Sequence, residues 1–434
     1  MSNAITSFLF SNTSVRQTIF KNTFWITLSA GICKALRAVL IIYLARALGP
    51  TDYGKFAFAL AFISLFVSFF DMGVPIIATR EFSKEGAKRE EFNSLISLKI
   101  VLGIATVILI FSLSLFITSS PEIQRLIWIL TLASFFGQFP EIFYSLFRSK
   151  EKMEYEAFIN VFQVLLLSGI IFFVILNFLS PKNISFGYLI ANLITLIVAG
   201  AFFCRKFAPI KGLVDVKIWK RFLVMAWPLA LTSIFGMIYG YFDSAFLGYS
   251  NQVKETGLYN AALRIINIAV LPSGIITMTF YPVLSRLSCE KEKTSFQKLF
   301  NYQMKILMAI AVFLILIGVV FAPQIISLIY GPSYLPAVSA FRVLLATTGI
   351  SYLLASFSQI FIIFNKQWKY FWVTFWGAII NVILDLVLIP AFSLYGAAVA
   401  SFFATFLMLV LSLFYIYKNI PVKIFSYKNN RLFI

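Results

Sequence analysis

Two basic residues lie three positions apart near the middle of an apolar stretch at residues 24–46. At this spacing Lys34 and Arg37 share one face of a helix, and the stretch holds no acidic residue that could neutralise them. An ionisable residue inside a membrane span costs about 2.5–3.5 kcal/mol on insertion scales, and it usually marks a transport path. Arg presents a planar fork of donors to phosphate oxygens, and Lys adds a compact charge. We therefore predict that both residues bind a diphosphate. The alternative is a set of buried ion pairs that only fixes helix packing.

A second group of polar residues lies in the other half of the chain. Arg264 forms an i, i+4, i+7 stripe with Asn260 and Asn267, and Tyr239 lies on a comparable stripe that ends at Asp243. We predict that Arg264 joins the diphosphate site and that Asn260, Asn267 and Tyr239 line the same cleft. The alternative for Arg264 is a structural ion pair with Asp243, which is predicted at similar depth.

Four acidic residues also fall inside apolar stretches, namely Asp71, Glu141, Asp243 and Asp385. Intramembrane carboxylates exchange protons or bind cations in transporters, so these four are candidates for coupling transport to an H⁺ or Na⁺ gradient. Asp71 is the strongest candidate because it lies deep in its stretch and on a polar face. Each carboxylate could instead pair with a nearby Lys or Arg.

The residue types that most often support catalysis are scarce. The chain has no His, which is the commonest general base, and its three Cys residues lack metal-ligand or redox spacing. We find no Gly-rich nucleotide-binding loop. We therefore expect no metal site, no cofactor and no enzymatic activity.

Membrane-spanning helices must position these residues. Of the 434 residues, 60% are hydrophobic and 12% are charged, and the mean hydropathy is +0.91. This composition excludes a soluble globular protein and predicts an all-α polytopic membrane protein. Apolar stretches of spanning length occur at twelve places: 24–46, 56–79, 96–118, 126–147, 157–178, 184–203, 222–247, 257–283, 304–321, 337–364, 371–389 and 394–417.

The placement of basic residues tests this count. If the N-terminus is cytoplasmic, nearly all Lys and Arg outside the spans fall in the two tails and in the loops after even-numbered spans. The opposite loops hold only Lys55, Arg125, Lys182 and Lys254. This asymmetry follows the positive-inside rule and predicts that both termini are cytoplasmic. The formal net charge of +19 therefore reflects topology, and we expect no nucleic-acid partner.

The twelve spans divide into two halves of six around a basic linker. We expect a cytoplasmic N-terminal segment (1–23), an N-lobe (24–204), a basic cytoplasmic linker (205–221), a C-lobe (222–417) and a basic cytoplasmic tail (418–434). Because six is even, both lobes start at the same face and run in parallel. Gly-Tyr pairs at matching places in the two halves support a repeat. The predicted architecture is two parallel six-helix lobes around a central cleft.

Several short motifs carry a family resemblance. Residues 45–50 (Ala-Arg-Ala-Leu-Gly-Pro) with Tyr53 and Gly54 resemble the first hairpin of bacterial polysaccharide flippases, and residues 280–282, 330–334 and 381–400 resemble later parts of the same family. This is the Wzx-type branch of the multidrug/oligosaccharidyl-lipid/polysaccharide (MOP) exporter superfamily. The resemblance implies a bacterial inner-membrane protein with a central cationic cavity. It implies that the cargo is an undecaprenyl-diphosphate-linked oligosaccharide, moved from the cytoplasmic to the outer leaflet, and that a polysaccharide polymerase is a possible partner.

Two other functions stay open. A drug or organic-cation antiporter of the same superfamily would need uncompensated acid near its site, whereas the stretch around Lys34 and Arg37 offers none. A membrane-embedded glycan polymerase or glycosyltransferase would need a carboxylate or His constellation at the membrane face, usually in a substantial loop. The predicted outer loops are all short. We therefore favour the flippase, whose partners would be the lipid-linked oligosaccharide and membrane lipids.

Overall fold

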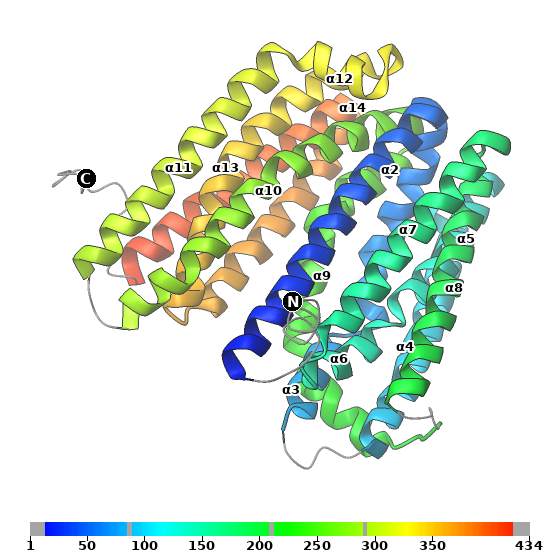
Figure 1. The fold of residues 1–434 in the computed structure, drawn as a ribbon. Helices are drawn as coiled ribbons and strands as arrows, with labels where there is room; N and C mark the ends of the chain where they lie inside the picture. Colours follow the sequence, from blue (N-terminus) through cyan, green and yellow to red (C-terminus); the bar gives the residue numbers. More distant parts are fainter. Residues whose placement is uncertain (1–13, 85–88, 208–211, 290–292, 420–434) are drawn as a thin grey trace, which may run out of the picture. The chain divides into compact units, whose positions relative to one another are not determined.

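The computed structural model describes residues 14–84, 89–207, 212–289 and 293–419, and every regular element in these ranges is a helix (Figure 1). This confirms the predicted all-α class. The chain forms two compact units, which we call the N-unit (Met1–Met237) and the C-unit (Ile238–Ile434).

The N-unit consists of helices that pack along one another. α2 lies beside α7 and also packs on α5, while α8 packs on both α5 and α7. The elements are α2 (Val15–Phe66), η1 (Val67–Phe70), α3 (Val74–Phe82), α4 (Arg89–Ile117), α5 (Pro121–Gln138), α6 (Glu141–Ser149), α7 (Met153–Asn177), α8 (Pro181–Lys206) and the first part of α9 (Val216–Tyr249).

The C-unit is built around α13, which packs against α10, α11 and α14. Its elements are the rest of α9, α10 (Val253–Cys289), α11 (Lys293–Val320), α12 (Ala322–Tyr330), η2 (Pro332–Ala337), α13 (Val338–Ile363) and α14 (Gln367–Asn419).

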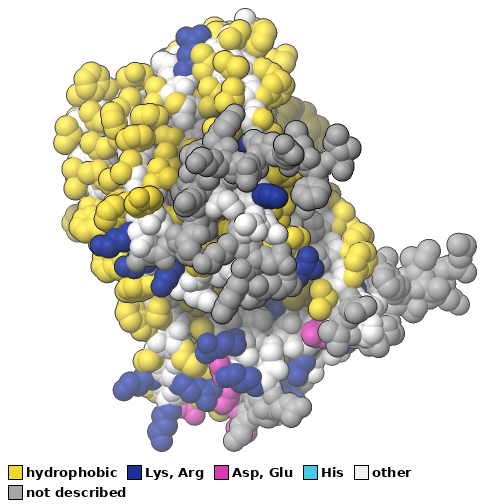
Figure 2. Space-filling model, turned by 90° about the vertical axis from the view of Figure 1, so that its left-hand side faces the viewer, with side chains coloured by type: hydrophobic (Ala, Val, Ile, Leu, Met, Phe, Trp, Pro, Cys, Tyr) yellow, Lys and Arg dark blue, Asp and Glu magenta, His cyan; other side chains and the backbone are white. Residues whose placement is uncertain are grey.

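Ten helical segments among the described residues are long and apolar enough to cross a membrane. Two of them, Gln17–Phe82 with 66 residues and Gln367–Lys418 with 52 residues, are each long enough for two crossings of about 20 residues. Non-helical backbone divides the first at Gly49 and the second at Ser393. In Figure 2, hydrophobic side chains cover much of the face shown, and Lys, Arg, Asp and Glu side chains gather mainly toward its lower end. Hydrophobic side chains exposed over so much of a surface suit helices that contact lipid.

The glycines of the motifs quoted above have structural roles. Gly49 has φ 73° and Gly331 has φ 99°, a region that other residues rarely adopt, and both lie where a helix bends or ends. At Gly396 a Cβ atom would collide with the carbonyl oxygen of Leu388 across the bend in α14. These motifs therefore encode bends and close backbone approach.

Two predicted spans are interrupted. The stretch 56–79 breaks after Phe66 into η1 and a turn in which Met72 and Gly73 have φ 48° and 72°, before α3 begins. The stretch 126–147 breaks at Phe139 and Pro140, between α5 and α6. Asp71 and Glu141 lie at these two breaks, where helical backbone pairing is incomplete.

The division between the two units falls inside α9. The sequence analysis placed the start of the C-lobe at 222, whereas the C-unit begins at Ile238. The first part of α9 belongs to the N-unit because its buried face packs there: Phe222 lies in one hydrophobic cluster with Phe82, Phe92 and Phe203.

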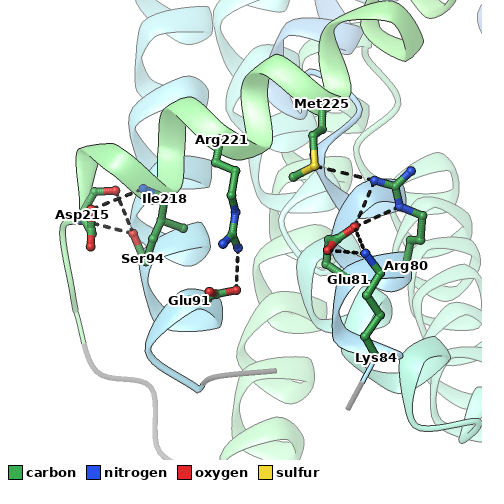
Figure 3. Close-up of polar contacts among 9 residues, drawn as sticks. All are labelled: Arg80, Glu81, Lys84, Glu91, Ser94, Asp215, Ile218, Arg221 and Met225. Atoms are coloured by element: carbon green, nitrogen blue, oxygen red, sulfur yellow. Dashed lines mark hydrogen bonds and ion pairs between the residues drawn. The ribbon is translucent and has the colours of Figure 1, made fainter. Parts of the chain in front are cut away.

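Polar contacts fasten the start of α9 to α3 and α4 (Figure 3). Asp215 caps α9 by accepting from the Lys217 backbone N–H at 2.8 Å. Its own backbone N–H donates to Ser94 Oγ at 3.2 Å. Further along, Arg221 pairs with Glu91 at 2.7 Å, and Arg80 contacts the sulfur of Met225 at 3.6 Å.

Candidate functional site

The predicted basic pair lies on α2 of the N-unit, and both side chains are exposed. The neighbouring Cys33 and Leu40 are buried and anchor this part of the helix. Arg37 Nη2 donates a hydrogen bond to Gln163 Oε1 on α7 at 3.2 Å. Among the described residues its hydrogen-bond partner is therefore a neutral amide, and no described carboxylate pairs with the guanidinium.

Gln163 belongs to a longer chain of amides. Its Nε2 donates to Asn192 Oδ1 on α8 at 2.8 Å, and Asn192 Nδ2 donates to the Ala133 carbonyl oxygen on α5 at 2.9 Å. Asn192 is buried, with an exposed fraction of 9%. Gln163 and Asn192 were not predicted as site residues. Both are polar residues inside predicted spans, but they carry no charge, and charge was the main signal used for the site.

Asp71 forms an ion pair with Lys99 on α4. The Lys99 side chain is only 5% exposed, and Glu141 also interacts with it electrostatically. Lys99 lies inside α4 and is buried. The coupling roles of Asp71 and Glu141 stay predictions, and these contacts favour their structural alternative.

Glu141 takes part in a second ionic group of the N-unit. Arg148 Nη2 lies 3.4 Å from Glu141 Oε2 and 2.5 Å from Glu156 Oε1, and Arg148 Nε donates to Glu156 Oε2 at 2.7 Å. The two bonds to Glu156 form a bidentate pair, which fixes Arg148 at the junction of α6 and α7.

The remaining two acids come together in the C-unit. The exposed fractions of Asp243 on α9 and Asp385 on α14 are 6% and 0%. Tyr259 and Ser401 donate hydroxyl hydrogen bonds to Asp243 Oδ2 at 2.5 and 2.6 Å. The Asp385 carboxyl interacts electrostatically with that of Asp243, so the two acids lie near each other.

With both carboxyls ionised, five buried polar atoms at this place lack a donor or acceptor among the described residues. They are Asp243 Oδ1, both carboxylate oxygens of Asp385, and Oδ1 and Nδ2 of Asn381, which lies one turn before Asp385. Two like charges in a buried site repel strongly, so the arrangement needs a proton or a cation between them. The sequence analysis named both acids but did not predict that they meet.

The described partners of Asp243 do not include Arg264, with which an ion pair was the predicted alternative. We considered an ion pair with Arg264, but the described partners of Asp243 are the hydroxyls of Tyr259 and Ser401. Arg264 is half-buried on α10. Its place in a diphosphate site with Lys34 and Arg37 stays a prediction.

The three predicted cleft residues have different surroundings. Asn260 is buried, and its Nδ2 donates to Ser244 Oγ at 3.0 Å and to the Thr256 carbonyl at 2.9 Å. The Tyr239 hydroxyl lies 2.7 Å from Thr405 Oγ1, and Asn267 is exposed. Of the three, Asn267 is the most exposed.

A protein-family model described as "Polysaccharide biosynthesis protein" matches residues 19–288, more than half of the chain. The chain belongs to this family. The match confirms the resemblance stated above and includes Lys34, Arg37 and Arg264, although Asp385 lies beyond it.

Curated relatives match at low identity. The capsular polysaccharide biosynthesis protein CapF of Staphylococcus aureus is 22% identical over 420 residues, which cover 92% of this chain and 99% of CapF. A putative O-antigen transporter of Escherichia coli K12 is 25% identical over 271 residues, covering 61% of this chain and 64% of that protein.

Solved structures share the fold. The lipid II flippase MurJ in an inward closed conformation superimposes with a TM-score of 0.74 and 17% sequence identity, covering 90% of this chain and 87% of MurJ. Multidrug transporters of the MOP superfamily match as well. These likenesses show that the chain shares the fold of these transporters, and they do not identify what it binds.

Proposed function

We propose that this protein moves an undecaprenyl-diphosphate-linked oligosaccharide from the cytoplasmic to the outer leaflet of a bacterial inner membrane. In this proposal the chain crosses the membrane twelve times, with both termini cytoplasmic, as two parallel six-helix lobes that rock around a central cleft. A polysaccharide polymerase would use the delivered lipid. The family membership and the relatives named for capsular polysaccharide biosynthesis and O-antigen transport support this reading.

The exposed pair Lys34 and Arg37 is the observation that carries the proposal. The apolar stretch 24–46 around them contains no acid, and the described partner of Arg37 is an amide. Positive charge that is retained in a low-dielectric setting attracts phosphate oxygens strongly. An organic cation would meet repulsion at the same place, which disfavours the antiporter.

The acids of the C-unit supply the coupling site of this proposal. Asp243, Asp385 and Asn381 hold buried oxygens without donors, and hydroxyl oxygens of Tyr259 and Ser401 are adjacent. A set of hard oxygen ligands around two carboxylates suits a proton or a hard cation such as Na⁺. Its binding would change the charge at the C-unit in step with the transport cycle.

Flipping assays in liposomes test the proposal. The purified protein is reconstituted with a fluorescent undecaprenyl-diphosphate oligosaccharide, and an impermeant quencher reports which leaflet holds the probe. Lys34→Ala and Arg37→Ala should each reduce flipping by at least tenfold, with unchanged membrane insertion. Lys182→Ala removes an exposed charge at the start of α8 and should flip at the wild-type rate.

Wild-type flipping by the Lys34→Ala/Arg37→Ala double variant would refute the assignment of the site. Transport of organic cations at rates that the same substitutions increase would favour the antiporter instead.

A further inference from the structure

The amide chain that ends at Arg37 has a direction that the hydrogen-bonding chemistry determines. A carbonyl oxygen can only accept, so Asn192 must turn its NH₂ group toward Ala133. The Asn192 oxygen then faces Gln163, which must turn its own NH₂ toward Asn192. The Gln163 oxygen is left to face Arg37. No other assignment of the two amides satisfies all three bonds.

The backbone makes room for this chain. A Cβ atom on Gly137 would lie 3.0 Å from Asn192 Nδ2, so the absence of a side chain there lets the amide approach α5. Asn192 thus reaches the carbonyl of Ala133, one helical turn before Gly137. The buried end of the chain is anchored on main-chain atoms, and its free end holds the guanidinium.

Arg37 differs from three buried or half-buried cations of the N-unit in the kind of group that it contacts. Lys99 pairs with Asp71, Lys21 pairs with Glu154 at 3.0 Å, and Arg148 pairs with Glu156. In each of these pairs a carboxylate cancels the charge. The amide oxygen of Gln163 orients the guanidinium and carries no net charge.

We propose that Gln163 is a positioning residue that holds the Arg37 fork at full charge, so that the site prefers a diphosphate to a monophosphate head group. This inference rests on the proposed function. A guanidinium of fixed orientation can bind oxygens of both phosphates in parallel, whereas a freely rotating one loses that geometric preference. Asn192 and Ala133 act through Gln163 by fixing the direction of its amide.

Two substitutions separate charge from orientation. Gln163→Glu keeps the size and the acceptor for Arg37 but adds a negative charge, so binding of undecaprenyl diphosphate and undecaprenyl phosphate should both weaken by about tenfold. Gln163→Met keeps the size and the charge of Arg37 but removes the strong acceptor. Its binding of undecaprenyl phosphate should stay within about twofold of wild type, while the preference for the diphosphate falls at least fivefold.

The measurement is equilibrium binding of both lipids to purified protein in detergent, with thermal unfolding recorded for every variant. Asn177→Asp is the matched control, because it makes the same amide-to-acid change at the exposed far end of α7. If Gln163→Glu does not fold, Gln163→Met alone decides. Wild-type diphosphate preference in Gln163→Met overturns the positioning role.

The proposed function and this inference fail differently. If Arg37→Ala leaves diphosphate binding unchanged, the diphosphate site itself is wrong. If Arg37→Ala weakens binding but neither Gln163 variant does, the site stands and the positioning role is refuted.

Discussion

Replacing Asp385 with Asn is the sharpest test of the paired carboxylates. Two ionised carboxylates about 4 Å apart repel by about 4 kcal/mol at an effective dielectric of 20. Asp385 is fully buried near Asp243, so a proton or a cation bound there would relieve most of that repulsion. Asn keeps the shape of the side chain and removes one of the two charges.

Thermal unfolding in detergent measures the effect. A cation present at 100 times its dissociation constant stabilises the folded state by about 2.7 kcal/mol. The wild-type unfolding temperature should therefore rise with Na⁺ at fixed pH if Na⁺ is the coupling ion. If the proton is the coupling ion, the unfolding temperature in Na⁺-free buffer should rise as the pH is lowered. Asp385→Asn should unfold at a higher temperature than wild type in Na⁺-free buffer at pH 8, and it should lose both dependences.

The matched control is Glu255→Gln, which removes an acid from the first turn of α10 in the same unit. It should keep the ion dependence of wild type. The same variants in the flipping assay connect stability to coupling, because Asp385→Asn should transport without responding to an imposed Na⁺ or H⁺ gradient. If Asp385→Asn retains the wild-type ion dependence of both stability and transport, the carboxylate pair is not the coupling site.

Two further substitutions test the structural readings. Lys99→Met leaves the half-buried Asp71 carboxylate without its Lys partner and should lower stability by up to about 3 kcal/mol, with partial recovery when Asp71→Asn is added. Thermal unfolding measures both, and additive losses would show that the two side chains do not act as a pair. Gly396→Ala places a methyl group against the Leu388 carbonyl across the bend in α14 and should lower the free energy of unfolding by about 1–3 kcal/mol. Gly200→Ala, whose methyl group meets open space, should leave it unchanged. Equal unfolding temperatures for the two variants would contradict the close approach.

The sequence alone predicted the class of the fold well, because membrane helices leave a strong signal in hydropathy and loop charge. It did not predict the break at Met72 and Gly73, since the apolar pattern continues through it and a glycine in such a run does not reveal its φ. The position of the division inside α9 also could not be predicted from the sequence pattern. The basic linker suggested a boundary, but the packing of Phe222 in the N-unit decides to which unit the first turns of α9 belong.

The candidate site was predictable only where single residues were unusual. Lys34 and Arg37 stand out because charge inside a span is rare. Asp243 and Asp385 stand out for the same reason, yet α9 and α14 are far apart in the sequence, and only the packing of the C-unit brings the two carboxyls together. Gln163 carries no charge, and its role depends on what each end of its amide contacts.

The two units differ in the partners of their ionisable residues. In the N-unit, carboxylates pair with the buried Lys21 and Lys99 and with the half-buried Arg148, while the described partner of Arg37 is an amide. In the C-unit, Asp243 accepts from two hydroxyls, whereas neither oxygen of Asp385 has a donor among the described residues, and neither acid has a described basic partner. A proton or a cation would compensate their charge. In the proposed mechanism, an anionic cargo would therefore bind at Arg37 and a coupling cation at the two acids of the C-unit, since no described partner of opposite charge compensates either site. If the two sites were merely structural, replacing the amide at Arg37 with an apolar side chain and Asp385 with a neutral amide would leave transport and its response to ion gradients unchanged, and the Gln163→Met and Asp385→Asn variants test that directly.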